Sequence, residues 1–143
     1  MPDYKNSRIY TVRCRTDSSL IYVGSTTRPL SRRFSAHKCQ PTCSLYKYIN
    51  NPDNNTTWDD WYIELYEENQ YDNVEQLNKR EGEIMRAIST INKNIAGRTI
   101  KQYNIDNKDK LRIKYIFNKN KKILYYLIIN IILILLCQYF YQI

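Results

Sequence analysis

The first clear pattern along the chain is an alternation of side chains over residues 8–14. Ile9 and Thr11 fall on one set of alternate positions, and Tyr10 and Val12 fall on the other. A period of two is typical of a β-strand whose two faces meet different surroundings. Residues 8–14 are therefore predicted to form a strand.

A turn and a second strand are predicted next. Residues 15–19 contain the run Thr-Asp-Ser-Ser, a cluster of residues that favour turns. Residues 20–24 then return to the apolar and aromatic composition of a strand. The two strands with this turn between them predict a β-hairpin.

A helix is predicted directly after the hairpin. Thr26 or Thr27 can cap its N-terminus, and Pro29 would then lie in its first turn. The helix should end near His37 or Lys38.

Two pairs of residues on this predicted helix lie one turn apart. Leu30 and Phe34 are expected to face the core, while Arg33 and His37 would share a neighbouring face. The helix can therefore present a basic pair beside the hairpin.

The middle of the chain alternates short elements with a polar loop. Residues 44–49 are expected to be a short helical or irregular piece, and residues 50–57 contain an Asn-Asn-Pro-Asp-Asn-Asn run with strong turn chemistry. Residues 58–66 have strand composition, with Trp61 and Ile63 alternating against Tyr62 and Glu64. A third strand is predicted there.

A longer amphipathic helix is predicted after the third strand, with Asp72 or Asn73 as its N-terminal cap. Apolar residues recur at steps of three and four, as expected for one face of a helix. This stripe consists of Val74, Leu77, Ile84, Ile88 and Ile91. Glu81 falls in step with them.

A carboxylate on an apolar face needs a partner, because its desolvation costs several kcal/mol unless charges or hydrogen bonds compensate. One interpretation of Glu81 is a partly buried salt bridge to Arg33 or Arg86. The other is a metal ligand at the floor of a cleft. The helical spacing does not separate the two.

Charge divides the chain into three regions. Its 143 residues leave room for one small domain and an appendage. Residues 1–98 are close to neutral, whereas residues 99–122 hold eight lysines and arginines against two aspartates, most of the net charge of +8. Residues 123–143 contain no charged residue. We therefore predict a domain, a basic arm and an apolar C-terminal helix.

The apolar segment, residues 123–143, is long enough to span a bilayer, and the preceding lysines would keep the N-terminal domain on the cytoplasmic side. Asn130, Gln138 and Gln142 weigh against a membrane anchor. The other interpretation is an apolar helix that packs on the domain or on a second subunit.

Composition also bears on the compartment. The first residues lead into a polar stretch without the apolar core of a secretory signal, so an intracellular protein is expected. The four cysteines form no recognisable disulfide framework. His37, Cys39 and Cys43 are close enough to suggest zinc, but no fourth ligand is spaced to complete a tetrahedral site.

Two aromatic tripeptides carry a resemblance to a known family. Arg8-Ile9-Tyr10 and Tyr22-Val23-Gly24 are followed by Arg33 with His37, and then by Glu81 and Asn92. In this order and spacing, residues 8–98 resemble the GIY-YIG nucleases, in particular the small single-domain members found in large DNA viruses. Arg8 replaces the glycine that opens the first motif in the family.

The resemblance implies a fold and a site. The fold would be an α+β domain with a three-stranded, mainly antiparallel sheet flanked by helices, followed by a helical arm. The site residues that the resemblance implies are Tyr10, Tyr22, Arg33, His37, Glu81 and Asn92. Arg33 is preferred to Arg32 because it has the family's four-residue spacing to His37, and Arg32 would point about 100° away on the helix.

The activity implied by the resemblance is the metal-dependent hydrolysis of DNA phosphodiester bonds. Glu81 would hold Mg²⁺ or Mn²⁺, and Arg33 would bind the phosphate. Tyr10, assisted by His37, would orient or deprotonate the attacking water, and Tyr22 would hydrogen-bond that water or Tyr10. The alternatives are a non-catalytic, nuclease-like DNA-binding module and a tail-anchored membrane protein.

A second signal for DNA lies in the basic arm. Residues 103–111 are echoed by residues 115–123 at an offset of twelve, and lysines interleaved with tyrosines can neutralise phosphates and stack on bases. The alternative is a solvated charged linker. The residues expected to contact DNA are Arg32 in the domain and Lys108, Lys110, Lys119, Lys121 and Lys122 in the arm.

Overall fold

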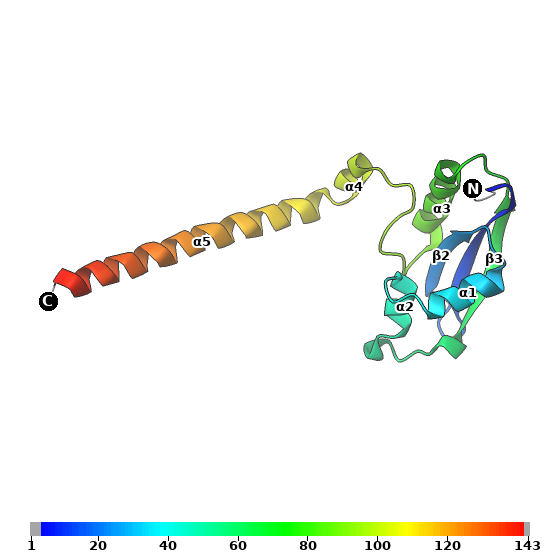
Figure 1. The fold of residues 1–143 in the computed structure, drawn as a ribbon, viewed down its shortest axis with the longest axis horizontal. Helices are drawn as coiled ribbons and strands as arrows, with labels where there is room; N and C mark the ends of the chain where they lie inside the picture. The colour runs from blue at the N-terminus through cyan, green and yellow to red at the C-terminus, as the bar shows by residue number, and fades with distance from the viewer. Residues whose placement is uncertain (1–3, 142–143) are drawn as a thin grey trace. The chain divides into compact units, whose positions relative to one another are not determined.

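The structure is a computed structural model that describes residues 4–141 (Figure 1). Its contacts divide the chain into two units, Met1–Arg98 and Thr99–Ile143. The first unit contains a sheet with helices packed on it, and the second consists of two helices. The α+β architecture predicted from the sequence is confirmed.

Three antiparallel strands form the sheet. They are β1 (Ser7–Cys14), β2 (Ile21–Thr26) and β3 (Trp61–Asn69), in the order β2-β1-β3. The central strand β1 buries side chains on both faces, as Ile9 and Tyr10 show, since neither is exposed. The predicted hairpin is therefore correct, and β3 joins it along the other edge of β1.

The third strand differs from its predicted bounds. Residues 58–60 form a short 3₁₀ turn in which Asp60 and Thr57 make reciprocal capping hydrogen bonds, and the strand begins at Trp61. It continues to Asn69 because its far end pairs with the start of β1, where Arg8 forms an ion pair with Glu68 at 2.7 Å.

Two short helices cover one face of the sheet. Helix α1 spans Leu30–Lys38 and α2 spans Ser44–Ile49. Their apolar residues pack on the face that carries Tyr10 and Val12. The predicted threonine cap of α1 is wrong: Pro29 is the N-cap residue without a side-chain hydrogen bond, because Thr26 still belongs to β2.

Helix α3, Val74–Ile88, covers the other face. Asn73 caps it by accepting a hydrogen bond from the amide of Gln76, as predicted. Its apolar stripe is shorter than expected at both ends. Val74 is largely exposed, and Ile91 lies beyond the helix, buried in the cluster around Tyr10.

The segment after α3 folds back on it. A Cβ on Gly82 would lie 2.1 Å from the carbonyl oxygen of Ala96, so this close approach requires glycine. Gly97 has a φ of +63°, the left-handed conformation that glycine adopts most readily. The fold-back brings residues 89–96 against β2, which matters for the site.

The second unit contains α4 (Ile100–Asp106) and α5 (Lys108–Tyr141). The basic arm thus begins with α4, and the rest of the arm and most of the predicted apolar helix are one continuous helix. We expected that residues 123–143 could anchor the chain in a membrane, and residues 142–143 lie outside the described residues. Within the described part of the chain, no helix is long and apolar enough to cross a bilayer.

Candidate active site

The two aromatic tripeptides meet in the sheet. Tyr10 on β1 is paired with Gly24 on β2, and the ring of Tyr10 lies across this glycine. A Cβ on Gly24 would lie 2.4 Å from the hydroxyl oxygen of Tyr10, closer than any side chain can approach. The absence of a side chain on Gly24 therefore lets the buried Tyr10 place its hydroxyl over the edge strand.

Two residues of α1 hold that hydroxyl. The Arg33 Nε lies 2.8 Å from the Tyr10 oxygen, and the His37 Nε2 lies 2.7 Å from it. Arginine can only donate, so the hydroxyl accepts from Arg33 and has its own proton available for His37. The four-residue spacing that puts Arg33 and His37 on one helix face brings both of them to Tyr10.

Cys43 extends this hydrogen-bond chain. The Nδ1 of His37 lies 3.3 Å from the sulfur of Cys43, which lies 3.8 Å from the hydroxyl of Tyr22. If His37 accepts at Nε2, it carries its proton at Nδ1 and donates it to Cys43. Tyr22 also presents its ring to the edge of His37, with centroids 5.3 Å apart. Tyr10 and Tyr22 are thus connected through His37 and Cys43.

Glu81 enters the site from α3 on the other face of the sheet. Its carboxylate is 9% exposed and accepts a hydrogen bond from the Ser25 hydroxyl at 2.6 Å. The salt bridge considered above is absent: within the described residues, Glu81 forms no ion pair, and Arg86 donates to the carbonyl of Gly82. The partner of the buried carboxylate is a hydroxyl group.

The pKa values show that these side chains act on one another. Burial raises the pKa of Glu81, whereas the Ser25 hydrogen bond and the Arg33 charge oppose that shift. Burial raises the pKa of Tyr10 to about 12, with Arg33 opposing and Glu81 adding to the shift. Glu81 therefore belongs to the same electrostatic cluster as Tyr10 and Arg33.

Both remaining titratable groups are neutral at pH 7. Burial, assisted by the charge of Arg33, lowers the pKa of His37 to about 4. Burial raises the pKa of Tyr22 far above its ordinary value, and the neighbouring Tyr10 adds to this shift. A neutral His37 can accept a proton from Tyr10, which a protonated imidazole could not do.

Asn92 lies beside the site without touching the Tyr10 hydroxyl cluster. Its side chain bonds both backbone groups of Val23, accepting from the amide at 2.8 Å and donating to the carbonyl at 2.8 Å. Ser89 donates a further bond to the same amide oxygen. Asn92 therefore holds the fold-back segment on the edge of β2 that faces away from β1.

Two cavities open beside Arg33. One has a volume of about 320 Å³ and is lined by the start of α1 and of α3, and the other, of about 420 Å³, is lined by α2 and the fold-back segment. Arg32 lines the first, while Tyr22 and Asn92 line the second. Arg33 lines both, so a ligand in either cavity would lie beside its side chain.

Glu81 is suited to one kind of metal ion. Among the described residues, no group of three His, Cys, Asp or Glu side chains could hold a metal, which leaves the zinc interpretation of His37, Cys39 and Cys43 without support. Hard cations such as Mg²⁺ take oxygen ligands and commonly keep several waters around one or two carboxylates. The single carboxylate of Glu81, with one oxygen bonded to Ser25, fits a cation of that kind.

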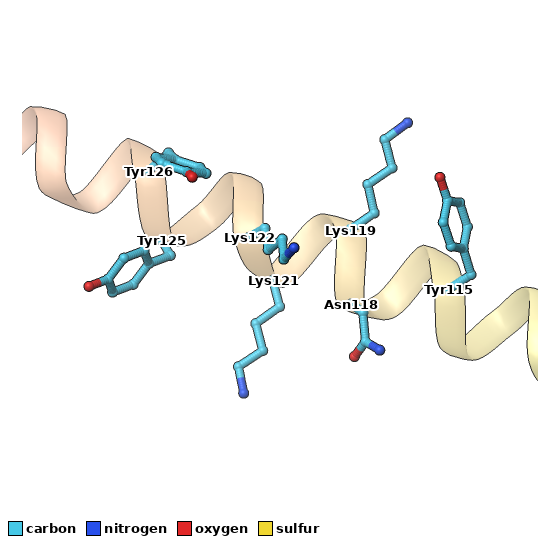
Figure 2. A pocket seen from close by; sticks show the side chains of 7 residues that line it. All are labelled: Tyr115, Asn118, Lys119, Lys121, Lys122, Tyr125 and Tyr126. Atoms are coloured by element: carbon cyan, nitrogen blue, oxygen red, sulfur yellow. The ribbon is translucent and has the colours of Figure 1, made fainter.

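The arm lysines belong to the second unit. In Figure 2, the side chains of Lys119, Lys121 and Lys122 leave α5 in different directions among exposed tyrosines. The hollow beside them, of about 740 Å³, is bounded by α5 alone and is therefore a gap between exposed side chains. Lys108 and Lys110 are also exposed.

Sequence reasoning missed Cys43 and Ser25 as parts of this cluster. Cys43 was considered only as a zinc ligand, and nothing in the spacing relates it to Tyr22. Ser25 lies next to Gly24 in the second motif, and its alternation with Gly24 along β2 places it on the face that Glu81 approaches. That alternation was the one signal available for Ser25.

Comparison with known proteins bears on the first unit. The family described as the GIY-YIG catalytic domain matches residues 6–94, which is more than half of the chain. No curated protein and no solved structure matches the chain.

Proposed function

The chain belongs to the GIY-YIG family of nucleases, and we propose that it is a metal-dependent endonuclease that hydrolyses phosphodiester bonds in DNA. The observation that carries this proposal is the Tyr10 hydroxyl, held between Arg33 and a neutral His37. Glu81 lies in the same electrostatic cluster.

Arg33 is the phosphate-binding residue of this proposal. Its Nε donates to Tyr10, which leaves the terminal nitrogens of the guanidinium for the two cavities that it lines. A guanidinium offers a planar fork of donors that matches two phosphate oxygens. Arg33 therefore both orients the tyrosine and neutralises the phosphate next to it.

Tyr10 and His37 handle the proton of the attacking water. At pH 7 the Tyr10 hydroxyl is protonated, because burial raises its pKa to about 12. With Arg33 still donating to it, the Tyr10 oxygen accepts a proton from the water through its other lone pair and passes its own proton to His37 Nε2. The water oxygen forms its bond to phosphorus as the bond to the leaving oxygen breaks, and that oxygen is protonated by solvent.

Glu81 is the residue that would hold the cation, Mg²⁺ or Mn²⁺. Such a cation, when bound, supplies positive charge to the phosphate and the leaving oxygen. Ser25 fixes the carboxylate by its hydrogen bond to Oε2, which leaves Oε1 as the oxygen for the cation. Tyr22 and Asn92 support the site: Tyr22 contacts His37, and Asn92 fixes the backbone of β2 next to Gly24.

The arm is proposed to hold the domain on DNA. Its lysines and tyrosines are exposed, as a contact with phosphates and bases requires. Lys110 and Lys122, which the repeat aligns, both lie in α5, where an offset of twelve residues is a rotation of about 120°. The charges therefore surround α5 rather than line one side, which favours sequence-independent contact with the backbone.

A nicking assay tests the enzyme. Supercoiled plasmid, branched DNA and single-stranded DNA are incubated with the full chain in Mg²⁺ or in EDTA. We expect cleavage in Mg²⁺ only, and its loss by about a hundredfold to a thousandfold in Glu81→Gln or Arg33→Gln, the scale at which removing one charge-stabilising group acts. Glu83→Gln is the matched control, since Glu83 is an exposed carboxylate on the same helix that pairs with Arg80.

Two outcomes would contradict the proposal. Cleavage that persists in EDTA would show that the activity does not depend on a metal ion, and cleavage by Glu81→Gln at the wild-type rate would show that it does not depend on this carboxylate. DNA binding without cleavage under every condition would instead support the non-catalytic DNA-binding module.

A further inference from the structure

The two cavities beside Arg33 have the same electrostatic character. The smaller one is lined by Arg28 and Arg32, and the larger one by Lys47 and Lys93. Among residues 4–141, no aspartate or glutamate lines either cavity. Each cavity therefore places two positive side chains beside the proposed phosphate-binding residue.

These basic side chains differ from those that lie beside β3. Arg8, Arg13 and Arg80 are neutralised by glutamates of β3, with which they form ion pairs. Among the described residues, none of the four cavity residues has an acidic partner within ion-pair distance. The domain thus neutralises its basic residues along β3 and leaves those around Arg33 available to an external anion.

The size of the cavities suits a segment of nucleic-acid backbone. Each has room for roughly ten or more water molecules, at about 30 Å³ per molecule. A phosphate with part of its sugar is of comparable size. Polar groups complete the lining, with Thr27 and Asn78 in the smaller cavity and Asn94 in the larger.

We propose that the two cavities bind the phosphates on either side of the cleaved bond in one DNA strand. Arg28 and Arg32 hold the backbone on one side, and Lys47 with Lys93 hold it on the other. This inference rests on the proposed function, in which the cleaved phosphate lies at Arg33. A strand engaged there must continue in both directions, and the two unpaired basic cavities that share Arg33 provide for both.

Binding measured in EDTA separates these contacts from cleavage. The affinity of the full chain for a short fluorescent duplex is measured across a range of salt concentrations. Three double variants are compared with wild type: Arg28→Gln with Arg32→Gln, Lys47→Gln with Lys93→Gln, and a control, Arg15→Gln with Lys79→Gln. The control removes the same charge from two exposed residues that line neither cavity.

Each cavity variant should lose about two phosphate contacts. The slope of log affinity against log salt then falls by roughly 1.4 to 1.8, at about 0.7 to 0.9 per contact. The control should keep the wild-type slope, and thermal unfolding should show all variants folded. A slope that falls equally in the control would overturn the inference, because the loss would then reflect net charge alone.

A scan with neutral methylphosphonates assigns the two sides. Single phosphates along one strand are replaced in turn, and binding in EDTA is measured again. In wild type, replacements on both sides of a central position should weaken binding. The Arg28 and Arg32 variant should become insensitive on one side only, and the Lys47 and Lys93 variant on the other side only.

The outcomes distinguish this inference from the proposed function. Suppose that each cavity variant becomes insensitive to methylphosphonates on one side only, but that the protein never cleaves DNA. This result would support the two phosphate-binding cavities and reject the nuclease activity. Cleavage with the same methylphosphonate pattern in every variant would support the nuclease and reject the two cavities.

Discussion

Globular proteins usually bury apolar side chains and expose polar ones, and each unit of this chain departs from that rule in its own way. The first unit buries polar and titratable groups, including Tyr10, His37 and Glu81. The second unit exposes large apolar residues along α5. These include Ile113, Tyr115, Ile116, Phe117, Ile123, Leu124, Leu127, Ile128 and Ile132.

The two units also differ in whether other contacts compensate for these side chains. Every fully buried side-chain nitrogen or oxygen among the described residues has a hydrogen-bond partner, so the desolvation cost of the first unit is offset by pairing. The exposed side chains of α5 form no core among the described residues. The first unit therefore depends on tertiary contacts, and α5 depends mainly on its local helical hydrogen bonds. Chemistry that requires fixed geometry belongs to the first unit.

Apart from the removal of Glu81 or Arg33, the largest loss of activity is expected from a single methyl group added in the sheet. Gly24→Ala would place a Cβ within 2.4 Å of the Tyr10 hydroxyl oxygen and push the ring aside. A displacement of about 1 Å in a catalytic group can cost about a hundredfold in rate. We therefore expect plasmid nicking to fall by at least that factor. Tyr10→Phe, which removes the hydroxyl without a clash, should give a similar loss with the fold retained.

Gly97→Ala is the matched control for Gly24→Ala. Its positive φ makes alanine unfavourable there, at a cost of roughly 1–2 kcal/mol, and an added Cβ would approach the backbone of Asn78 and Lys79 rather than Tyr10 or Arg33. Nicking per folded molecule should be unchanged in this variant. If Gly97→Ala lost as much activity as Gly24→Ala, general destabilisation rather than displacement of Tyr10 would explain both.

The second effect is a pH dependence of stability that His37 confers on the first unit. Its folded-state pKa is lowered to about 4, mainly by burial, so between this value and about 6.5 the unfolded chain binds more protons than the folded chain. Stability is therefore fully present above about 6.5 and is lost as pH falls toward 4. The loss is on the order of 3 kcal/mol.

The measurement compares wild type with His37→Gln by denaturant unfolding across this pH range. His37 is the only histidine of the chain, so the difference between the two curves isolates its contribution. Carboxylates with lowered pKa values, such as Asp60 and Glu67, affect both proteins alike. Parallel curves would show that His37 is not buried in neutral form.

Most of the first unit could be predicted because its patterns are local. The alternation in β1 and the four-residue step from Arg33 to His37 define faces, and the structure brings those faces together at Tyr10. Element ends were less predictable, because they depend on partners distant in the sequence. β3 extends to Asn69 only because β1 is there to pair with it.

The contacts of the site could not be predicted in the same way. Helical spacing placed Glu81 on the buried face, but it did not identify Ser25, which lies on a strand 56 residues earlier. Cys43 reaches His37 through the turn between α1 and α2, and no residue pattern encodes that approach. The sequence thus predicts which face a residue occupies, whereas the partner on the opposite element requires the structure.

A third effect, smaller than the first two, is expected in the arm. Replacing Lys119, Lys121 and Lys122 together by glutamine should weaken DNA binding by about tenfold at moderate salt, because up to three phosphate contacts are removed. The cleavage rate at saturating DNA should not change, since no arm lysine is placed in the site. Affinity and single-turnover nicking, measured on the same plasmid, check both parts.

A triple lysine-to-arginine variant at the same positions is the control for the arm. It keeps the charge, so its affinity should equal that of wild type. A loss in this variant would mean that the lysines act through a specific contact. A lower nicking rate at saturating DNA in the glutamine variant would contradict the proposal that the arm contributes to DNA binding and the first unit alone to cleavage.

The smallest effect is on folding stability. Replacing Glu81 should stabilise the protein, although the same change removes its nicking activity. Burial raises the pKa of this carboxyl above its unfolded value, so its ionised form costs stability once the pH exceeds the unfolded pKa. Glu81→Gln keeps an acceptor for Ser25 but removes the charge. At neutral pH the variant should be more stable than wild type by a few tenths to about 1 kcal/mol, while nicking is abolished. Urea unfolding at pH 7 and near pH 4 measures this, and the gain should shrink at the lower pH as Glu81 becomes protonated in wild type. A variant less stable than wild type at pH 7 would mean that the carboxylate contributes to folding, and that its burial serves structure rather than a cation.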